Sequence, residues 1–123
     1  MFADCRGLTD LRVSKWNVSN IQNFDAAFNE CSKLEELDLT GWRTTSARSF
    51  TQMFESCAKL KKIIGLENFV TTSIDSYAPF KDLNGEDMVS SYPFTVFYEM
   101  FFNCGQLEEI DLSSFDNSKA EGY

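Results

Sequence analysis

The four cysteines of the chain recur in one local frame, and their spacing constrains the fold more than any other feature. The first three are 26 residues apart, and the fourth follows 47 residues later. Each has a phenylalanine three residues before it and a leucine three residues after it. A fixed period of this length predicts repeated units, each of which is stable only when it stacks on its neighbours. The frames are Phe2-Cys5-Leu8, Phe28-Cys31-Leu34, Phe54-Cys57-Leu60 and Phe101-Cys104-Leu107.

Further apolar residues keep the same register. Each frame continues with an aliphatic residue, a second aliphatic residue and an aromatic: Leu11, Val13 and Trp16; Leu37, Leu39 and Trp42; Ile63, Leu66 and Phe69; Ile110, Leu112 and Phe115. The third unit has one extra residue at Ile64-Gly65 and roughly twenty more between Ile74 and Phe97, which together explain the longer interval. We therefore predict one domain over residues 1–123, with about four repeats, the last incomplete, and an inserted loop at 75–96.

The apolar period changes within each unit. Residues 34–39 end in alternating apolar positions, as a short half-buried strand does. In the preceding stretch the apolar residues step by three or four, which places them on one face of a short helix. These are Ile21, Phe24, Phe28 and Cys31. We expect one short strand and one short helix per repeat, with parallel pairing between the strands of successive repeats.

Two segments carry a resemblance to a known family. At Met53-Phe54, Cys57 and Leu60, and again at Leu37-Asp38-Leu39 and Trp42, the chain resembles the BspA-like leucine-rich-repeat family. Those are mainly bacterial surface proteins with the consensus Met-Phe-x-x-Cys-x-x-Leu-x-x-Leu-Asp-Leu-Ser-x-Trp. The resemblance covers nearly the whole chain except the insertion. It implies an α/β fold, a right-handed leucine-rich-repeat solenoid, and an extracellular, adhesion-type role.

Stacked units predict continuous columns of equivalent side chains inside the solenoid. We expect one buried aromatic column from Trp16, Trp42, Phe69 and Phe115, and a second from Phe2, Phe28, Phe54 and Phe101. Met1 is in phase with later repeat residues, and neither end of the sequence looks like a polar cap. We interpret the chain as a segment of something longer, or as a subunit whose ends stack on a neighbour.

Composition excludes several classes of function. The net charge of −8, without a basic cluster, argues against partners with anionic backbones or surfaces, namely nucleic acid and acidic lipid. No apolar stretch is long enough to insert into a membrane. The absence of histidine removes Ser-His-Asp and Cys-His nucleophile pairs and the usual zinc ligands. A hydrolase with paired carboxylates is the remaining enzymatic alternative, but the acids recur at outward strand positions, where a solvated face is expected. We therefore predict a protein that is not an enzyme and uses no cofactor.

The cysteines allow three interpretations. Equivalent positions in stacked turns lie about 5 Å apart, which is within the Cα range of a disulfide. Side chains on one parallel ladder point the same way, however, and the BspA-like family uses this cysteine as a small buried hydrophobe. We expect four free thiols, with disulfides and a metal site as the alternatives.

Charged residues occupy the outward positions of the predicted strands. They are acidic in unit two (Glu35, Glu36, Asp38), basic in unit three (Lys61, Lys62) and acidic again in unit four (Glu108, Glu109, Asp111). Opposite charges on neighbouring strands fix the register of a sheet, which is one interpretation. The other is an open ligand surface, for which the candidate partner-binding residues are Arg12, Glu36, Asp38, Lys62, Glu109 and Asp111.

The insertion is the least repeat-like segment. It contains both prolines and the turn dipeptide Asn84-Gly85. Its aromatic and acidic side chains either cover the side of the solenoid as an apolar lid or form a contact loop. The spacing of its acids does not match a calcium-binding EF-hand loop. The candidate partner-binding residues here are Tyr77, Phe80, Asp82, Glu86, Asp87, Tyr92 and Phe94.

These observations favour a protein-binding module of a bacterial cell-surface or secreted protein. Its expected partner is a protein on a host or neighbouring cell, held by adhesion without chemistry. Two alternatives remain open. One is a structural subunit that assembles by stacking its solenoid ends. The other is an intracellular scaffold, which reduced cysteines fit better than an oxidising exterior.

Overall fold

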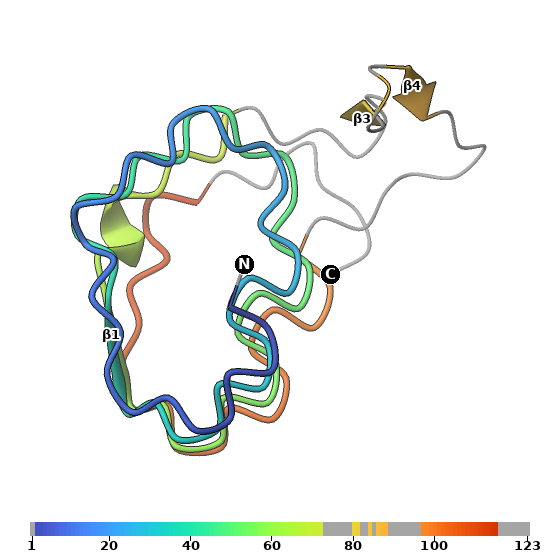
Figure 1. Cartoon of the computed structure of the whole chain (residues 1–123). Coiled ribbons are helices and arrows are strands. Elements are labelled where there is room, and N and C mark those ends of the chain that lie inside the picture. The colour runs from blue at the N-terminus through green and yellow to red at the C-terminus, as the bar shows by residue number, and fades with distance from the viewer. Residues whose placement is uncertain (1, 73–79, 82–83, 85, 89–96, 116–123) are drawn as a thin grey trace.

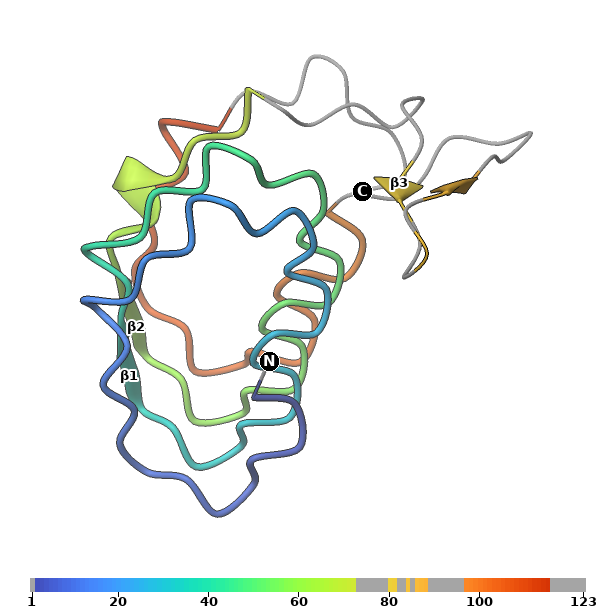
Figure 2. The same cartoon turned by 45° about the horizontal axis from the view of Figure 1, so that its top comes forward.

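The computed structural model describes residues 2–72, 80–81, 84, 86–88 and 97–115. The chain winds in successive coils that lie on one another, from the blue N-terminal coil to the orange C-terminal one (Figure 1). A turned view separates the coils into layers (Figure 2). We number them one to four by the cysteines that they contain: Cys5, Cys31, Cys57 and Cys104. The elements are β1 (Glu36–Asp38), β2 (Lys62–Ile64), the 3-10 helix η1 (Leu66–Asn68), β3 (Phe80–Lys81) and β4 (Asp87–Met88).

One side of the coils carries the parallel strands. β1 pairs with β2 in parallel, with Leu37 opposite Ile63, and an isolated parallel bridge joins Lys62 to Glu109 in coil four. The backbone N–H of Lys61 donates to the carbonyl oxygen of Glu35 at 2.8 Å. The strand segments of coils two to four therefore lie side by side in the register that the repeats predict. The equivalent segment of coil one, residues 10–13, forms no strand in the structure.

The opposite side of the coils consists of turns, where the sequence predicts helices. The described residues contain no α-helix. The N–H of Phe28 donates to the carbonyl oxygen of Met53 in the next coil at 2.8 Å. The N–H of Cys31 donates to Phe28 within its own turn at 3.2 Å. An α-helix would direct both to the residue four positions earlier, so the helix predicted over this segment is wrong.

Left-handed residues explain these turns. Ala26 and Glu30 have φ angles of 54° and 58°, and the residue before each of the four cysteines shares this conformation. A residue with positive φ ends a helical run. Each such turn brings the chain back to the interior after three or four residues, so the apolar spacing imitates that of a helix.

Most of the core lies in the two middle coils, between the strand side and the turn side. Leu34, Leu37 and Leu60 have no exposed surface, whereas Leu11 and Ile110 in the outer coils are half-buried. The stacking predicted for Phe2, Phe28, Phe54 and Phe101 is confirmed, since each successive pair of ring centroids is 5.6 Å apart. Phe28 and Phe54 are buried as predicted, whereas Phe2 and Phe101 are half-buried.

The tryptophan column is wrong for its first two members. Trp16 is 45% exposed and packs on Phe2 at 5.4 Å. Trp42 is buried, but its ring packs against Phe24 and Phe28 at 5.7 Å each. The last pair of the predicted column does stack, with 6.1 Å between the centroids of Phe69 and Phe115. Trp16 stays exposed because coil one is covered from one side only in the structure.

A further column was not predicted. The rings of Phe24, Phe50 and Phe97 stack at 5.5 and 5.9 Å. These residues stand seven positions before the cysteines of coils two, three and four, so the sequence carried the signal.

The extra residue of the third unit lies where two coils touch. Gly65 has a φ angle of 99°, and a Cβ atom there would lie 2.6 Å from the backbone of Leu39 and Thr40. Glycine is therefore required both for its conformation and for the close approach. The chain then forms η1, which returns it to the repeat register.

Part of the insertion forms a hairpin. β3 and β4 pair antiparallel, with Phe80 opposite Met88 and Lys81 opposite Asp87. The strands flank Asn84-Gly85, the dipeptide that predicted a turn. The insertion residues Tyr77, Asp82, Tyr92 and Phe94 lie outside the described residues, so the choice between lid and contact loop stays a prediction.

Candidate functional site

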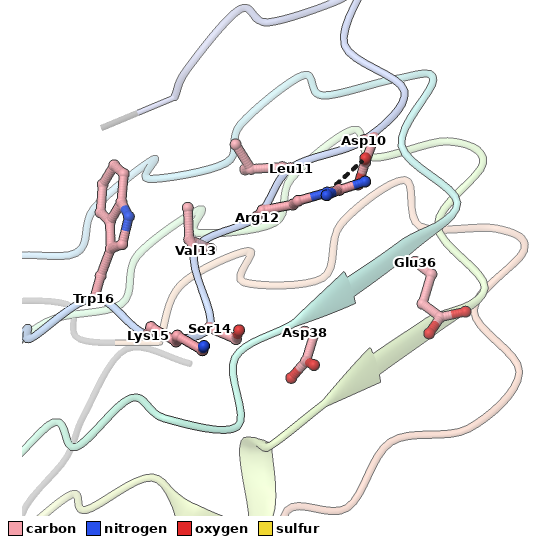
Figure 3. A pocket seen from close by; sticks show the side chains of 9 residues that line it. All are labelled: Asp10, Leu11, Arg12, Val13, Ser14, Lys15, Trp16, Glu36 and Asp38. Carbon is pink, nitrogen blue, oxygen red and sulfur yellow. Dashed lines mark hydrogen bonds and ion pairs between the residues drawn. The ribbon is translucent and has the colours of Figure 1, made fainter.

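Among the described residues, two hollows lie over the strand side of the coils. The first has a volume of about 510 Å³ and lies between coil one and β1 (Figure 3). It is lined by Asp10, Leu11, Arg12, Val13, Ser14, Lys15, Trp16, Glu36 and Asp38. The second has a volume of about 280 Å³ and lies between β2 and coil four. It is lined by Lys62, Ile63, Ile64, Glu67, Glu109, Ile110 and Asp111.

The strand register connects the two hollows. Glu36 lines the first, and its partner in the parallel ladder, Lys62, lines the second. Lys62 is bridged in turn to Glu109. All three side chains belong to exposed residues, whereas Leu37, which follows Glu36 along β1, is buried. Both hollows therefore belong to one outward surface, which we call the strand face and define by their lining residues.

The first hollow exists because coil one does not complete the sheet. Among the described residues, no backbone hydrogen bond joins residues 10–13 to β1. The coil is anchored further along, where the indole Nε1 of Trp42 donates to the carbonyl oxygen of Val13 at 2.8 Å. The coil-one segment is therefore held at one end and leaves an opening beside Glu36 and Asp38.

Side chains inside the first hollow are partly paired. The Nε of Arg12 contacts the Oδ2 of Asp10 at 3.2 Å, and both side chains are largely exposed (Figure 3). Figure 3 places the indole of Trp16 at one end of the row of lining residues and the carboxylate of Glu36 at the other. The lining of the hollow thus has an aromatic side chain at one end and a carboxylate at the other.

Two equivalent aspartates on the strand face are held by their own turns. The carboxylate of Asp38 accepts hydrogen bonds from the N–H and hydroxyl of Thr40, and that of Asp111 accepts one from the N–H of Ser113. These hydrogen bonds lower the pKa of both carboxyl groups below the ordinary value. Both aspartates therefore remain charged in mildly acidic solution.

Lys61 and Lys62, at the start of β2, test the interpretation that these charges fix the strand register. Lys61 Nζ lies 3.9 Å from Glu35 Oε2, a weak and exposed ion pair. Lys62 lies in register between Glu36 and Glu109. The alternation of charge across the ladder is thus present in space, while its use as a ligand surface stays a prediction.

The structure brings together all six residues predicted on the strands. Arg12, Glu36 and Asp38 line the first hollow, and Lys62, Glu109 and Asp111 line the second. Of the insertion candidates, Glu86 is exposed, and Phe80 and Asp87 belong to β3 and β4.

Among the charged and aromatic residues of this surface, sequence reasoning did not assign four: Asp10, Lys15, Trp16 and Glu67. Trp16 was placed in the core because its repeat equivalents are apolar, and no sequence signal distinguished it from them. For Lys15 and Glu67 a signal was available, because both are charged residues close in sequence to the strand segments.

The cysteines hold the coils together. All four are free thiols. Cys31 Sγ donates to the carbonyl oxygen of Phe2 at 3.2 Å, and Cys104 Sγ donates to that of Phe54 at 2.9 Å. Burial is the main cause that raises the pKa of Cys31 to about 11 and that of Cys57 to about 12. The thiols thus stay protonated as donors between coils, and within the described residues no group of acidic, histidine and cysteine side chains is arranged to hold a metal.

Comparison with known families gives two matches. The family described as "Mycoplasma protein of unknown function, DUF285" matches residues 1–85. The family described as "BspA type Leucine rich repeat region (6 copies)" matches residues 51–121. No curated protein and no solved structure matches the chain. Across the described residues, no helix has the length and apolar character needed to span a bilayer.

Proposed function

Because the chain belongs to the BspA-type leucine-rich-repeat family and to the Mycoplasma family DUF285, we propose that it is a protein-binding module whose strand face holds the partner. Repeat proteins of the BspA type are in general interaction modules without catalytic activity. The observation that carries the proposal is the pair of hollows in one exposed, charged surface.

The scaffold that we propose is a right-handed leucine-rich-repeat solenoid in which turns replace the short helices. Supporting it, the N–H groups of Phe28 and Glu30 donate to residues 53 and 55 of the next coil, and those of residues 54 and 56 donate to residues 100 and 102. A backbone tied between coils at such short intervals is rigid. Rigidity lowers the entropic cost of holding a surface ready for a partner.

The location that we propose is the surface of a bacterial cell or its secreted fraction, with adhesion to a protein on a host or neighbouring cell as the role. The BspA-type match supports this location. The mechanism is presentation by a fixed surface, and it needs neither a cofactor nor a reaction.

The experiment is a capture assay with surface proteins of candidate host cells. The immobilised wild type is compared with the variant Glu36→Ala/Asp38→Ala/Glu109→Ala, with a chain lacking residues 75–96, and with the off-face control Lys33→Ala/Lys59→Ala. We expect a specifically captured protein that the strand-face variant loses and the control retains. Equal capture by the wild type and the strand-face variant contradicts the proposal. Loss only with the deletion assigns binding to the insertion instead.

A second candidate function is assembly through the ends of the coil stack. Leu11 in coil one and Ile110 in coil four are half-buried, although their equivalents Leu37 and Ile63 are buried. Trp16 and Leu112 are 45% and 38% exposed. Such faces match each other in register, so a second copy can continue the stack. Sedimentation velocity tests this: concentration-dependent growth that Trp16→Glu abolishes supports assembly, and a monomer at all concentrations refutes it.

A further inference from the structure

The charges of the strand face point to the chemistry of the partner. We propose that the strand face takes an extended segment of the partner protein that carries arginine or lysine at every third residue. This inference rests on the proposed function, because it assumes that the strand face is the binding surface. It adds what kind of sequence the surface selects.

The first argument is the balance of charge. The two hollows are lined by six carboxylates, Asp10, Glu36, Asp38, Glu67, Glu109 and Asp111, and by three cationic side chains, Arg12, Lys15 and Lys62. Arg12 and Asp10 already contact each other. The remaining carboxylates outnumber the remaining cations, so a cationic segment is attracted to this surface and an acidic one is repelled.

The second argument is the shape of the first hollow. Its row of lining residues ends in the half-exposed indole of Trp16 and in the carboxylate of Glu36, with Asp38 between them (Figure 3). A guanidinium group can stack on the face of an indole ring, and its N–H groups can donate hydrogen bonds to carboxylates. Arginine therefore suits both kinds of side chain that line this hollow, the indole at one end and the carboxylates along the rest.

The third argument is the distance between the hollows. One lies between the strand segments of coils one and two, and the other between those of coils three and four. They are thus separated by two strand spacings, or about 10 Å. A polyproline II chain advances about 9 Å in three residues and returns to the same face. A segment that crosses the strands can therefore place residues i and i+3 in the two hollows.

The test uses synthetic peptides with the purified chain. Fluorescence anisotropy at low salt measures binding of labelled (Arg-Ser-Ser)₄, of an isomer with its four arginines contiguous, and of (Glu-Ser-Ser)₄. We expect the spaced arginine peptide to bind more tightly than its isomer and the glutamate peptide not to bind. Equal affinity of the two arginine peptides overturns the spacing, and absence of binding by both overturns the inference.

The matched variants separate this surface from general charge attraction. Asp38→Asn/Asp111→Asn removes two carboxylates from the strand face, and Asp4→Asn/Glu30→Gln removes two from the turn side of the coils. We expect the first to weaken (Arg-Ser-Ser)₄ binding by about tenfold and the second to leave it unchanged. Equal weakening by both means nonspecific attraction and overturns the inference. Circular dichroism of each variant checks that it is folded.

The capture assay separates failure of this inference from failure of the proposed function. Suppose that the strand-face variant no longer captures the surface protein and that the wild type binds neither arginine peptide. The proposed binding function then stands, and the proposal of a basic partner segment is wrong. If the strand-face variant still captures the surface protein, both proposals are wrong.

Discussion

The thiol of Cys57 donates a hydrogen bond to the carbonyl oxygen of Phe28, 29 residues earlier in the chain, at 3.1 Å. The same bond recurs from Cys31 to Phe2 and from Cys104 to Phe54. The cysteine is thus a donor that joins each coil to the one before it. A small residue with a weak donor fits this buried position, where a larger or charged side chain would not.

Removing this donor should destabilise the middle of the stack. We expect Cys57→Ala to lower the free energy of unfolding by about 1–3 kcal/mol, since it leaves a buried cavity and an unpaired carbonyl oxygen. Cys5→Ala should cost less, because Cys5 is half-buried in coil one. Urea denaturation followed by circular dichroism measures both, and a larger loss for Cys5→Ala would be inconsistent with the arrangement described.

The buried thiols predict a loss of stability in alkaline solution. In the folded chain the pKa of Cys31 is raised to about 11 and that of Cys57 to about 12, from an ordinary value of 9.0. Above pH 9 the unfolded chain releases protons that the folded chain retains, so unfolding becomes more favourable as the pH rises. We expect the free energy of unfolding to fall between pH 9 and 11, and to fall less steeply in Cys31→Ala/Cys57→Ala. Parallel slopes for the two proteins would contradict this.

Gly65 should tolerate no side chain. Gly65→Ala combines a strained φ angle with a Cβ atom 2.6 Å from the backbone of Leu39 and Thr40. We expect a loss of about 2 kcal/mol or more in the free energy of unfolding. The matched control is Gly105→Ala, where a Cβ atom would meet nothing within 4 Å. Comparable melting temperatures for the two variants would show that this contact between coils is absent.

Neutralising the lysines of coil three separates register from recognition. Lys61→Gln/Lys62→Gln removes the exposed pair with Glu35, so we expect at most about 1 kcal/mol of destabilisation. The same change makes the strand face more acidic and should tighten (Arg-Ser-Ser)₄ binding in the anisotropy assay. A large drop in melting temperature would favour the ladder as the main role of these charges, and weaker peptide binding would contradict a basic partner.

The sequence predicted the features that recur between coils. The frame around Cys5, Cys31, Cys57 and Cys104 located the repeat, the phenylalanine column and the parallel register, because each follows from equivalent positions stacked in space. The strand-face candidates followed from the same register, since alternate residues of a strand face outward.

The features that failed depend on contacts between coils that a single repeat does not reveal. A step of three or four apolar residues fits both a helix and a series of turns with left-handed residues such as Ala26 and Glu30. Trp16 matches Trp42 in the repeat, yet only Trp42 is covered on both sides. The first hollow forms because coil one does not pair with the free edge of β1. No residue type among residues 10–13 predicts this missing pairing.

The most direct test of the stacked coils is the destination of one backbone N–H. Scalar couplings across hydrogen bonds, measured by NMR, identify which carbonyl accepts from the amide of Phe28. The account predicts a coupling to the carbonyl carbon of Met53, 25 residues later in the chain. The amide nitrogen of Phe28 lies 2.8 Å from the carbonyl oxygen of Met53. A coupling to the carbonyl carbon of Phe24 would mean a helix in this segment, and the account would be wrong.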